Sequence, residues 1–196
     1  NYDNNIFIYF AKIYPLKLIL DKLNFVPNGY KEFMNNVIQK NIIFANGGKK
    51  IPEDNNSVDV IYSSHMLEHL DGEETSRFLE EAKRVLKSDG IIRIIVPDFN
   101  LLVQNYLKDL DPDKFIIDSC LAGEKPNTWI KKLQYIIQGH GWHFNMYNKI
   151  SLIQLFTKNG FKNIKILNPG ETNIKGVENI NVSPHESISL FLEASK

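Results

Sequence analysis

The stretch Ile51–Asp98 decides the fold, and it reads IPEDNNSVDVIYSSHMLEHLDGEETSRFLEEAKRVLKSDGIIRIIVPD. Residues Val58–Ser63 are mostly apolar, which is typical of a parallel strand buried on both faces. A second apolar run, Ile91–Val96, predicts another buried strand, closed by Pro97-Asp98. With a helix between them, the two strands form a βαβ unit, so we expect them to be parallel neighbours.

The helix between these strands has clear signals at both ends. Asp71 is suited to cap its start, and two glutamates follow in the first turn, where carboxylates favour the positive end of the helix dipole. Apolar residues then recur at helical spacing from Phe78 to Leu86 and form one stripe. Ser88-Asp89-Gly90 ends the helix, and we expect Gly90 to adopt a positive φ.

Strands and helices continue to alternate on both sides of this unit. Upstream, Lys22–Val26 is the candidate first strand, Tyr30–Gln39 is a helix or a second strand, and Asn41–Ala45 is a strand. Downstream, we expect helices over 100–110, 129–138 and 151–159, strands over 161–167 and 187–194, and irregular chain over 111–127.

The composition fits one domain with a substantial core, since 43% of the 196 residues are hydrophobic. The 23 basic and 23 acidic residues balance, which argues against nucleic acid as a partner. The single cysteine, Cys120, excludes an intramolecular disulfide and fits a cytoplasmic location.

The apolar run Ile6–Leu20 contains Lys12 and Pro15 and is too short for a stable membrane span. We interpret it as an amphipathic segment covering the domain, with peripheral membrane contact as the alternative.

Several motifs in this chain resemble the class I S-adenosylmethionine (SAM) dependent methyltransferases, and most closely a small, type 11-like family found among bacterial surface-polysaccharide genes. The pattern S-x-D-x-I-Y-S-S-H-x-L-E-H-L stands at Ser57–Leu70, and F-L-x-E-x-x-R-V-L-K-x-x-G stands at Phe78–Gly90. The strand pattern ending in V-P-D, the G-H-x-W-x-aromatic loop and the L-x-x-L-F helix follow at 91–98, 139–144 and 152–161.

The resemblance implies an α/β, Rossmann-like, doubly wound fold with a mostly parallel seven-stranded sheet and a hairpin-like end. We expect a single methyltransferase-like domain over 1–196. Its residues 1–40 are the divergent N-terminal part, and 99–150 form an insertion or lid on the acceptor side.

The implied function is SAM-dependent methyl transfer to a small-molecule or sugar acceptor, with O-methylation as the expected chemistry and polysaccharide biosynthesis as the setting. Ligands of this fold sit beyond the carboxyl ends of the parallel strands. Hydroxyl methylation needs a base, and histidine suits that role, so His140 is the first candidate and His65 the second. The resemblance assigns cofactor contacts to Asn24, Gly29, Asn46, Ser63, Ser64 and His65, and substrate contacts to Asp98, Trp142 and His143.

The cofactor-binding half departs from the family pattern. The loop that should carry Gly-x-Gly is Leu23–Gly29, where one glycine remains and bulky residues occupy the approach to the cofactor. The acidic residue at the end of the second strand corresponds to Asn35 or Asn36, and the acid near the adenine corresponds to Asn46. These departures motivate a rival hypothesis, a non-catalytic methyltransferase-fold binding or scaffold protein that has lost SAM binding. A processed or trimmed N-terminus is another explanation, because the chain begins at Asn1 rather than at methionine.

Structural roles compete with the catalytic ones at several positions. Glu68 and His69 are expected to act as a structural pair, Trp142 and Phe144 to pack in the core or a lid, and Asp98 to cap the following helix as readily as to bind substrate. The string His65–His69 also spells H-x-x-E-H, in which two histidines bind zinc. Because methyltransferases of the family carry this string without metal, we predict no metal site. The oligomeric state stays open.

Overall fold

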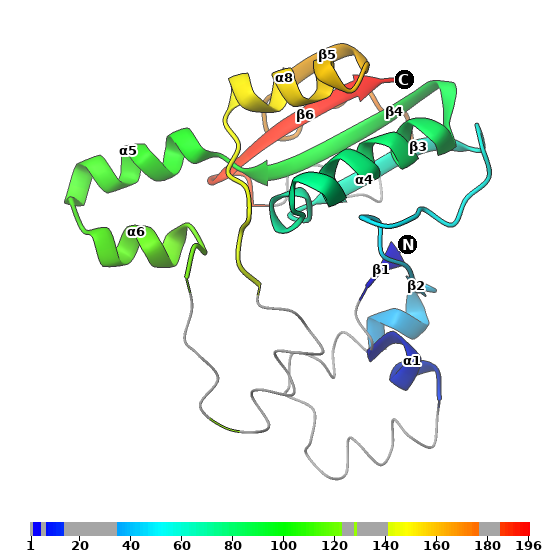
Figure 1. Cartoon of the computed structure of the whole chain (residues 1–196), viewed down its shortest axis with the longest axis horizontal. Helices are drawn as coiled ribbons and strands as arrows, with labels where there is room; N and C mark the ends of the chain where they lie inside the picture. The colour runs from blue at the N-terminus through cyan, green and yellow to red at the C-terminus, as the bar shows by residue number, and fades with distance from the viewer. Residues whose placement is uncertain (1, 5–6, 14–34, 123–127, 129–140, 177–184) are drawn as a thin grey trace. The chain divides into compact units, whose positions relative to one another are not determined.

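The computed structural model describes residues 2–4, 7–13, 35–122, 128, 141–176 and 185–196 (Figure 1). The chain divides into two compact units, one made of residues 1–50 and 125–140 and the other of residues 51–124 and 141–196. The prediction of a single domain over 1–196, with its lid at 99–150, stays a prediction.

The described residues of the smaller unit form two very short parallel strands and two helical segments. Strand β1 (Tyr2–Asp3) pairs in parallel with β2 (Ile43–Phe44), and helix α1 spans Phe7–Lys12. The strand predicted at Asn41–Ala45 is therefore present but shorter. Residues 35–39 are helical, so Asn35 and Asn36 do not end a strand as expected. The candidate strand at 22–26 lies outside the described residues.

The larger unit is built on a four-stranded mixed sheet in the order β3-β4-β6-β5. Strand β3 (Val58–Ser64) runs parallel to β4 (Leu86–Pro97), which confirms the predicted βαβ unit. Strand β6 (Ser189–Ser195) is antiparallel to both β4 and β5 (Lys162–Leu167), in agreement with the hairpin-like end. The described part of the chain thus shows a Rossmann-like α/β arrangement, while a mostly parallel sheet of seven strands stays a prediction.

Helix α4 (Gly72–Val85) begins as predicted at a capping box. The Asp71 carboxylate accepts hydrogen bonds from the N–H groups of Glu73 (2.9 Å) and Glu74 (2.8 Å), and the Glu74 side chain accepts from the Asp71 N–H (3.3 Å). The prediction of a positive φ at Gly90 is wrong, because the chain passes directly from α4 into β4. Gly90 is needed for space instead: a Cβ there would lie 2.9 Å from Leu86 Cδ2 and 3.1 Å from the Val58 carbonyl.

Helices α4 and α8 (Lys149–Lys158) cover the same face of the sheet (Figure 1). Side chains alternate between the two faces of a strand, so every second residue of β4 and β6 points to these helices. Helix α8 is capped by Asn148, whose side chain accepts from the Ser151 N–H at 2.9 Å, and it is followed by Gly160 with φ 74°. The core under the two helices comprises Phe78, Leu79, Ala82, Ile92, Ile94, Val96, Leu152, Phe156, Leu190, Leu192 and Ala194.

The opposite face of the sheet carries a buried ion pair between two directly paired strand residues. Arg93 Nη1 lies 2.6 Å from Glu193 Oε1, and the two side chains are 0% and 3% exposed. Arg93 also donates to the Glu171 carbonyl, and its guanidinium lies 5.4 Å from the ring centre of Phe191. The pair therefore ties the middle of the sheet to the segment after β5.

The environment of Glu193 favours its ionised form. Burial opposes ionisation, but hydrogen bonds from the Thr172 hydroxyl (2.6 Å), from Asn173 (2.8 Å) and from Arg93 outweigh it and hold the pKa of Glu193 below its ordinary value. The carboxylate is thus fully paired inside the protein.

Two helices follow β4 where the sequence predicts one. Helix α5 (Phe99–Asp109) is as expected, and it ends at Leu110, which takes the left-handed conformation with φ 54°. Helix α6 (Pro112–Asp118) corrects the expectation of irregular chain over 111–127. The missed signal is the dipeptide Asp111-Pro112, in which aspartate caps the helix and proline suits its first position.

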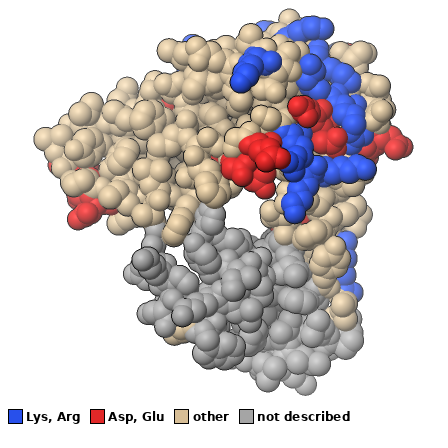
Figure 2. All heavy atoms as spheres, viewed as in Figure 1, with Lys and Arg blue, Asp and Glu red and all other residues tan. Residues whose placement is uncertain are grey.

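Charged side chains of opposite sign are neighbours on the surface. On the face shown in Figure 2, blue and red side chains lie next to one another. Ion pairs among the described residues include Arg77–Glu73, Arg84–Glu81 and Lys87–Asp59. No helix within the described ranges combines the length and the apolar composition needed to cross a bilayer.

We predict that Glu193→Gln lowers the free energy of unfolding by about 3–5 kcal/mol, because it leaves the Arg93 charge buried without its counter-ion. Urea denaturation of the full chain measures this change. Glu73→Gln is the matched control, since Glu73 is 81% exposed in its pair with Arg77 and the expected change stays below about 1 kcal/mol. Equal effects of the two substitutions would contradict the assignment.

Acidification should act on the same carboxylate. Because the folded-state pKa of Glu193 is depressed, its contribution is complete above the ordinary glutamate pKa of about 4.3 and is lost as the pH falls through the lower folded-state value. Unfolding measured between neutral and strongly acidic pH should therefore show a smaller loss of stability in Glu193→Gln than in the unaltered chain. Parallel curves for the two proteins would show that this carboxylate is not perturbed.

Candidate functional site

The carboxyl end of β3 is the position where the family pattern places the cofactor, and its geometry is well defined. Ser63 and Ser64 pair with Ile94 and Ile95 of β4, and the His65 N–H donates to the Ile95 carbonyl at 2.9 Å. His65 then takes the left-handed conformation with φ 50°, which histidine tolerates better than most side chains. The strand stops at this residue, and the chain turns into the short 3-10 helix η1 (Leu67–His69).

The ring of His65 is held by contacts from three directions. Its Nε2 lies 3.0 Å from the Ser189 hydroxyl, and its Nδ1 lies 3.3 Å from Oε1 of Glu68. The ring of His185 stands edge-on to it at 4.8 Å between centres. The contacts of Ser189 and His185 with His65 are not predictable from the sequence, because no local pattern links residues more than a hundred positions apart.

Glu68 lies at the centre of the site and is 1% exposed. Among the described residues, no group donates a hydrogen bond to either carboxylate oxygen, and the His65 ring at 3.3 Å is its ion-pair neighbour. The interpretation of Glu68 and His69 as a structural pair stays a prediction.

The loop 141–145 is fastened to η1 by main-chain hydrogen bonds. The Glu68 carbonyl accepts from the N–H groups of Phe144 (2.8 Å) and Asn145 (3.1 Å), and the Asn145 amide donates to the Leu70 carbonyl at 2.6 Å. His69 Nδ1 lies 3.0 Å from the Trp142 carbonyl. The described part of the predicted G-H-x-W-x-aromatic motif therefore contacts η1, the segment that follows the end of β3.

His143, a predicted substrate contact, faces Glu68 and His69 rather than standing apart. Its ring centre lies 4.8 Å from that of His69, and its main-chain N–H donates to the Cys120 carbonyl. Burial lowers the pKa of His143, while the Glu68 carboxylate opposes this shift and His65 and His69 add to it. His65, His69 and His143 thus gather around one carboxylate.

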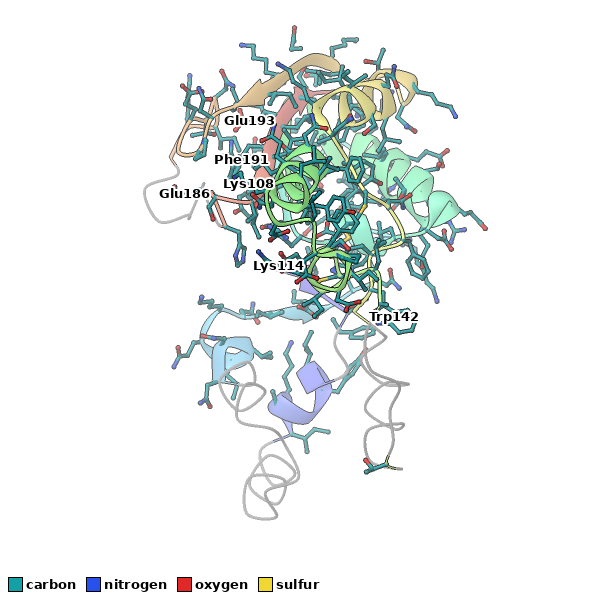
Figure 3. The ribbon with its side chains drawn as sticks, turned by 90° about the vertical axis from the view of Figure 1, so that its left-hand side faces the viewer. Lys108, Lys114, Trp142, Glu186, Phe191 and Glu193 are labelled. Carbon is teal, nitrogen blue, oxygen red and sulfur yellow. The ribbon has the colours of Figure 1, made fainter. Side chains whose placement is uncertain are left out.

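The other predicted substrate contacts lie differently. The Asp98 carboxylate accepts from the Asn100 N–H at 2.9 Å and caps α5, as the alternative interpretation held. Trp142, labelled in Figure 3, is partly buried, whereas Phe144 is 57% exposed and does not pack in the core. Substrate binding by Asp98 and Trp142 stays a prediction.

Three predicted residues, Asn24, Gly29 and His140, lie outside the described residues. Asn46 belongs to the smaller unit, where its side-chain oxygen accepts from the Gly48 N–H at 3.0 Å and shapes a turn. The contact of Asn46 with the adenine of the cofactor stays a prediction.

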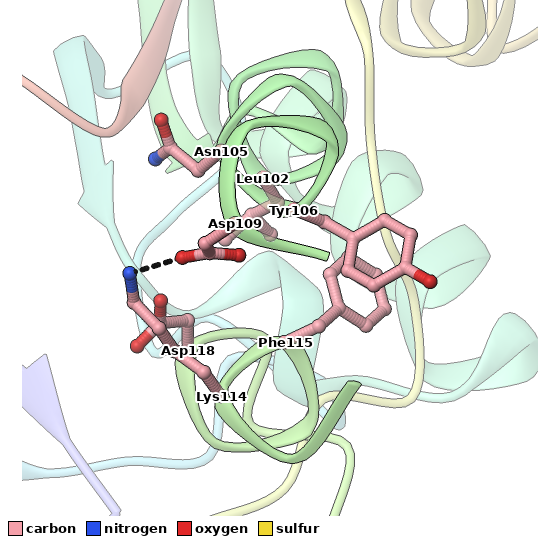
Figure 4. Close-up of a pocket in the computed structure, with 7 residues that line it drawn as sticks. All are labelled: Leu102, Asn105, Tyr106, Asp109, Lys114, Phe115 and Asp118. Carbon is pink, nitrogen blue, oxygen red and sulfur yellow. Dashed lines mark hydrogen bonds and ion pairs between the residues drawn. The ribbon is translucent and has the colours of Figure 1, made fainter. Parts of the chain in front are cut away.

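A small hollow lies between α5 and α6, away from these histidines along the chain (Figure 4). The Lys114–Asp109 ion pair and the edge-on rings of Tyr106 and Phe115 close it. The space admits nothing larger than a water molecule, so the hollow is no cofactor site. The ion pair and the ring contact that close it hold α5 and α6 together.

Residues 24–94 match a family model described as "Methyltransferase domain". The matched range runs from the predicted cofactor loop through β3, η1 and α4 into β4, and it contains every residue predicted to bind the cofactor. The match supports the predicted class of enzyme, a SAM-dependent methyltransferase. No curated protein matches the chain.

The chain is also similar to solved structures of SAM-dependent methyltransferases. With the Thermotoga maritima protein it shares 16% identity at a TM-score of 0.47, covering 85% of this chain and 70% of the other. With the Archaeoglobus fulgidus protein it shares 14% identity at a TM-score of 0.44, covering 79% of this chain and 67% of the other. With the Aquifex aeolicus protein it shares 16% identity at a TM-score of 0.44, covering 85% of this chain and 61% of the other.

We predict that Asn145→Ala loosens the loop 141–145, because the Leu70 carbonyl loses its donor at a cost of about 1 kcal/mol. Chymotrypsin should then cleave faster after Trp142 or Phe144, as followed by mass spectrometry. Asn100→Ala is the control, since Asn100 is exposed and its main-chain N–H, which donates to the Asp98 cap of α5, is kept in the variant. Identical cleavage rates in both variants would contradict the docking of this loop by Asn145.

Proposed function

We propose that this chain transfers the methyl group of SAM to a hydroxyl of a small-molecule or sugar acceptor. The observation that carries the proposal is the match of residues 24–94 to the methyltransferase domain, together with the βαβ unit whose first strand ends at Ser63-Ser64-His65. Ligands of such sheets bind beyond the carboxyl ends of the parallel strands, which is where these three residues lie.

The residues at this strand end suit the amino-acid part of SAM. Serine side chains are small and leave room for a ligand, and their hydroxyls can both donate and accept, as an ammonium and a carboxylate require. Ser64 is partly exposed, whereas Ser63 is nearly buried. SAM would supply the electrophilic methyl group, and these residues would orient it.

The acceptor hydroxyl needs a group that takes its proton. His140 is our first candidate, from the segment before the docked loop, and His65 is the second. The Glu68 carboxylate near His65 Nδ1 would stabilise a proton received by that ring. Trp142 and His143 would contact the acceptor beside it.

Thermal and chemical unfolding with SAM or S-adenosylhomocysteine tests cofactor binding directly. A ligand at about 100 times its dissociation constant should stabilise the folded chain by about 2.7 kcal/mol. No stabilisation by either compound at millimolar concentration would overturn the proposal and favour the binding or scaffold hypothesis.

Substitutions at the two ends of β3 locate the site. Ser64→Tyr fills the space at the carboxyl end, so we expect the affinity for SAM to fall by about tenfold or more, equivalent to at least 1.4 kcal/mol. Ser57→Tyr introduces the same side chain at an exposed position before the strand and should leave the affinity unchanged. Calorimetric titration that finds equal affinities in both variants would place the cofactor elsewhere.

A further inference from the structure

Glu68, His69 and His143 bring three metal-ligating side chains together. One carboxylate oxygen and one nitrogen from each ring lie within 4.8 Å of one another. Glu68 and His69 come from η1, and His143 comes from the loop fastened to it by hydrogen bonds. The two segments are far apart in sequence, so the fold itself creates this cluster.

A main-chain carbonyl group orients the ring of His69. His69 Nδ1 lies 3.0 Å from the Trp142 carbonyl, which can only accept, so this nitrogen carries the hydrogen and Nε2 keeps its lone pair. Metal-binding histidines are usually fixed by such a hydrogen bond from the nitrogen that does not face the ion.

The carboxylate of Glu68 is the independent observation that points to a ligand. It is 1% exposed, and no described residue donates a hydrogen bond to either oxygen. A buried carboxylate without hydrogen bonds is costly, and a divalent cation compensates such a charge. Oε1 lies 3.3 Å from the His65 ring, and a carboxylate has lone pairs enough to contact that ring and an ion together.

We propose that Glu68, His69 and His143 form a binding site for a divalent transition-metal ion, with zinc as its expected occupant. Two histidines and one glutamate are a known zinc ligand set that leaves the fourth position open to water or substrate. Ligand atoms of a tetrahedral zinc site lie about 3.3 Å apart, so the three side chains would move together by about 1.5 Å or less. The site departs from our expectation of no metal, and it uses His143 in place of His65 of the H-x-x-E-H string.

This site does not rest on the proposed methyl transfer, and its test needs no acceptor. The full chain, stripped with a chelator, is dialysed against Zn²⁺, and bound zinc is measured by atomic absorption. We expect one ion per chain, and Co²⁺ bound in its place should give the visible absorption of a tetrahedral complex.

Variants identify the ligands. Glu68→Gln, His69→Ala and His143→Ala should each weaken zinc binding by about tenfold or more, with circular dichroism confirming that they fold. His185→Ala is the matched control, since its ring contacts His65 and lies outside the three ligands, and it should bind zinc like the unaltered chain. The proposal would be overturned if the unaltered chain bound no stoichiometric zinc, or if each of the three single variants bound zinc as tightly as the unaltered chain.

Discussion

The buried carboxylate of Glu68 is the constraint on which the site depends. It lies one turn beyond the end of β3, where the left-handed backbone of His65 directs the chain away from the sheet and into η1. A charge in this position needs compensation, and three histidine rings surround it. The main chain of the same residue anchors the loop 141–145, so one residue determines both the electrostatics of the site and the path of the segment that faces it.

Among the described residues of the larger unit, two glutamates are buried, Glu68 and Glu193, and their charges serve different purposes. Glu193 has an arginine directly across the strand pair and further donors in the segment after β5, so its charge is fully satisfied and stabilises the sheet. Glu68 accepts no hydrogen bond from the described residues, and its histidine neighbours can change protonation or bind a ligand. An unsatisfied charge beside titratable rings is typical of a functional centre, whereas a satisfied ion pair is typical of a structural one.

The sequence predicts the local elements of this region well. Capping residues and apolar spacing give α4 and α8, and short apolar runs give β3, β5 and β6, because these signals act between near neighbours. Two local predictions are wrong. Asp111-Pro112 starts a helix where irregular chain is predicted, and Gly90 is needed for close packing rather than for a positive φ. The strand end at Ser63–His65 was also predictable, since it follows from the motif that begins at Ser57.

The convergence of distant residues was not predictable from local patterns. Nothing in the sequence around Ser189 or His185 indicates contact with His65. The docking of His143 beside Glu68 depends on main-chain hydrogen bonds, which form between backbone groups whatever side chains the residues carry. A crystal structure of the full chain grown with S-adenosylhomocysteine is the most direct test of the account. We predict the ligand at the carboxyl end of β3, with its amino-acid part beside Ser63, Ser64 and His65. A ligand bound elsewhere, or a strand end closed by side chains at saturating ligand, would contradict it.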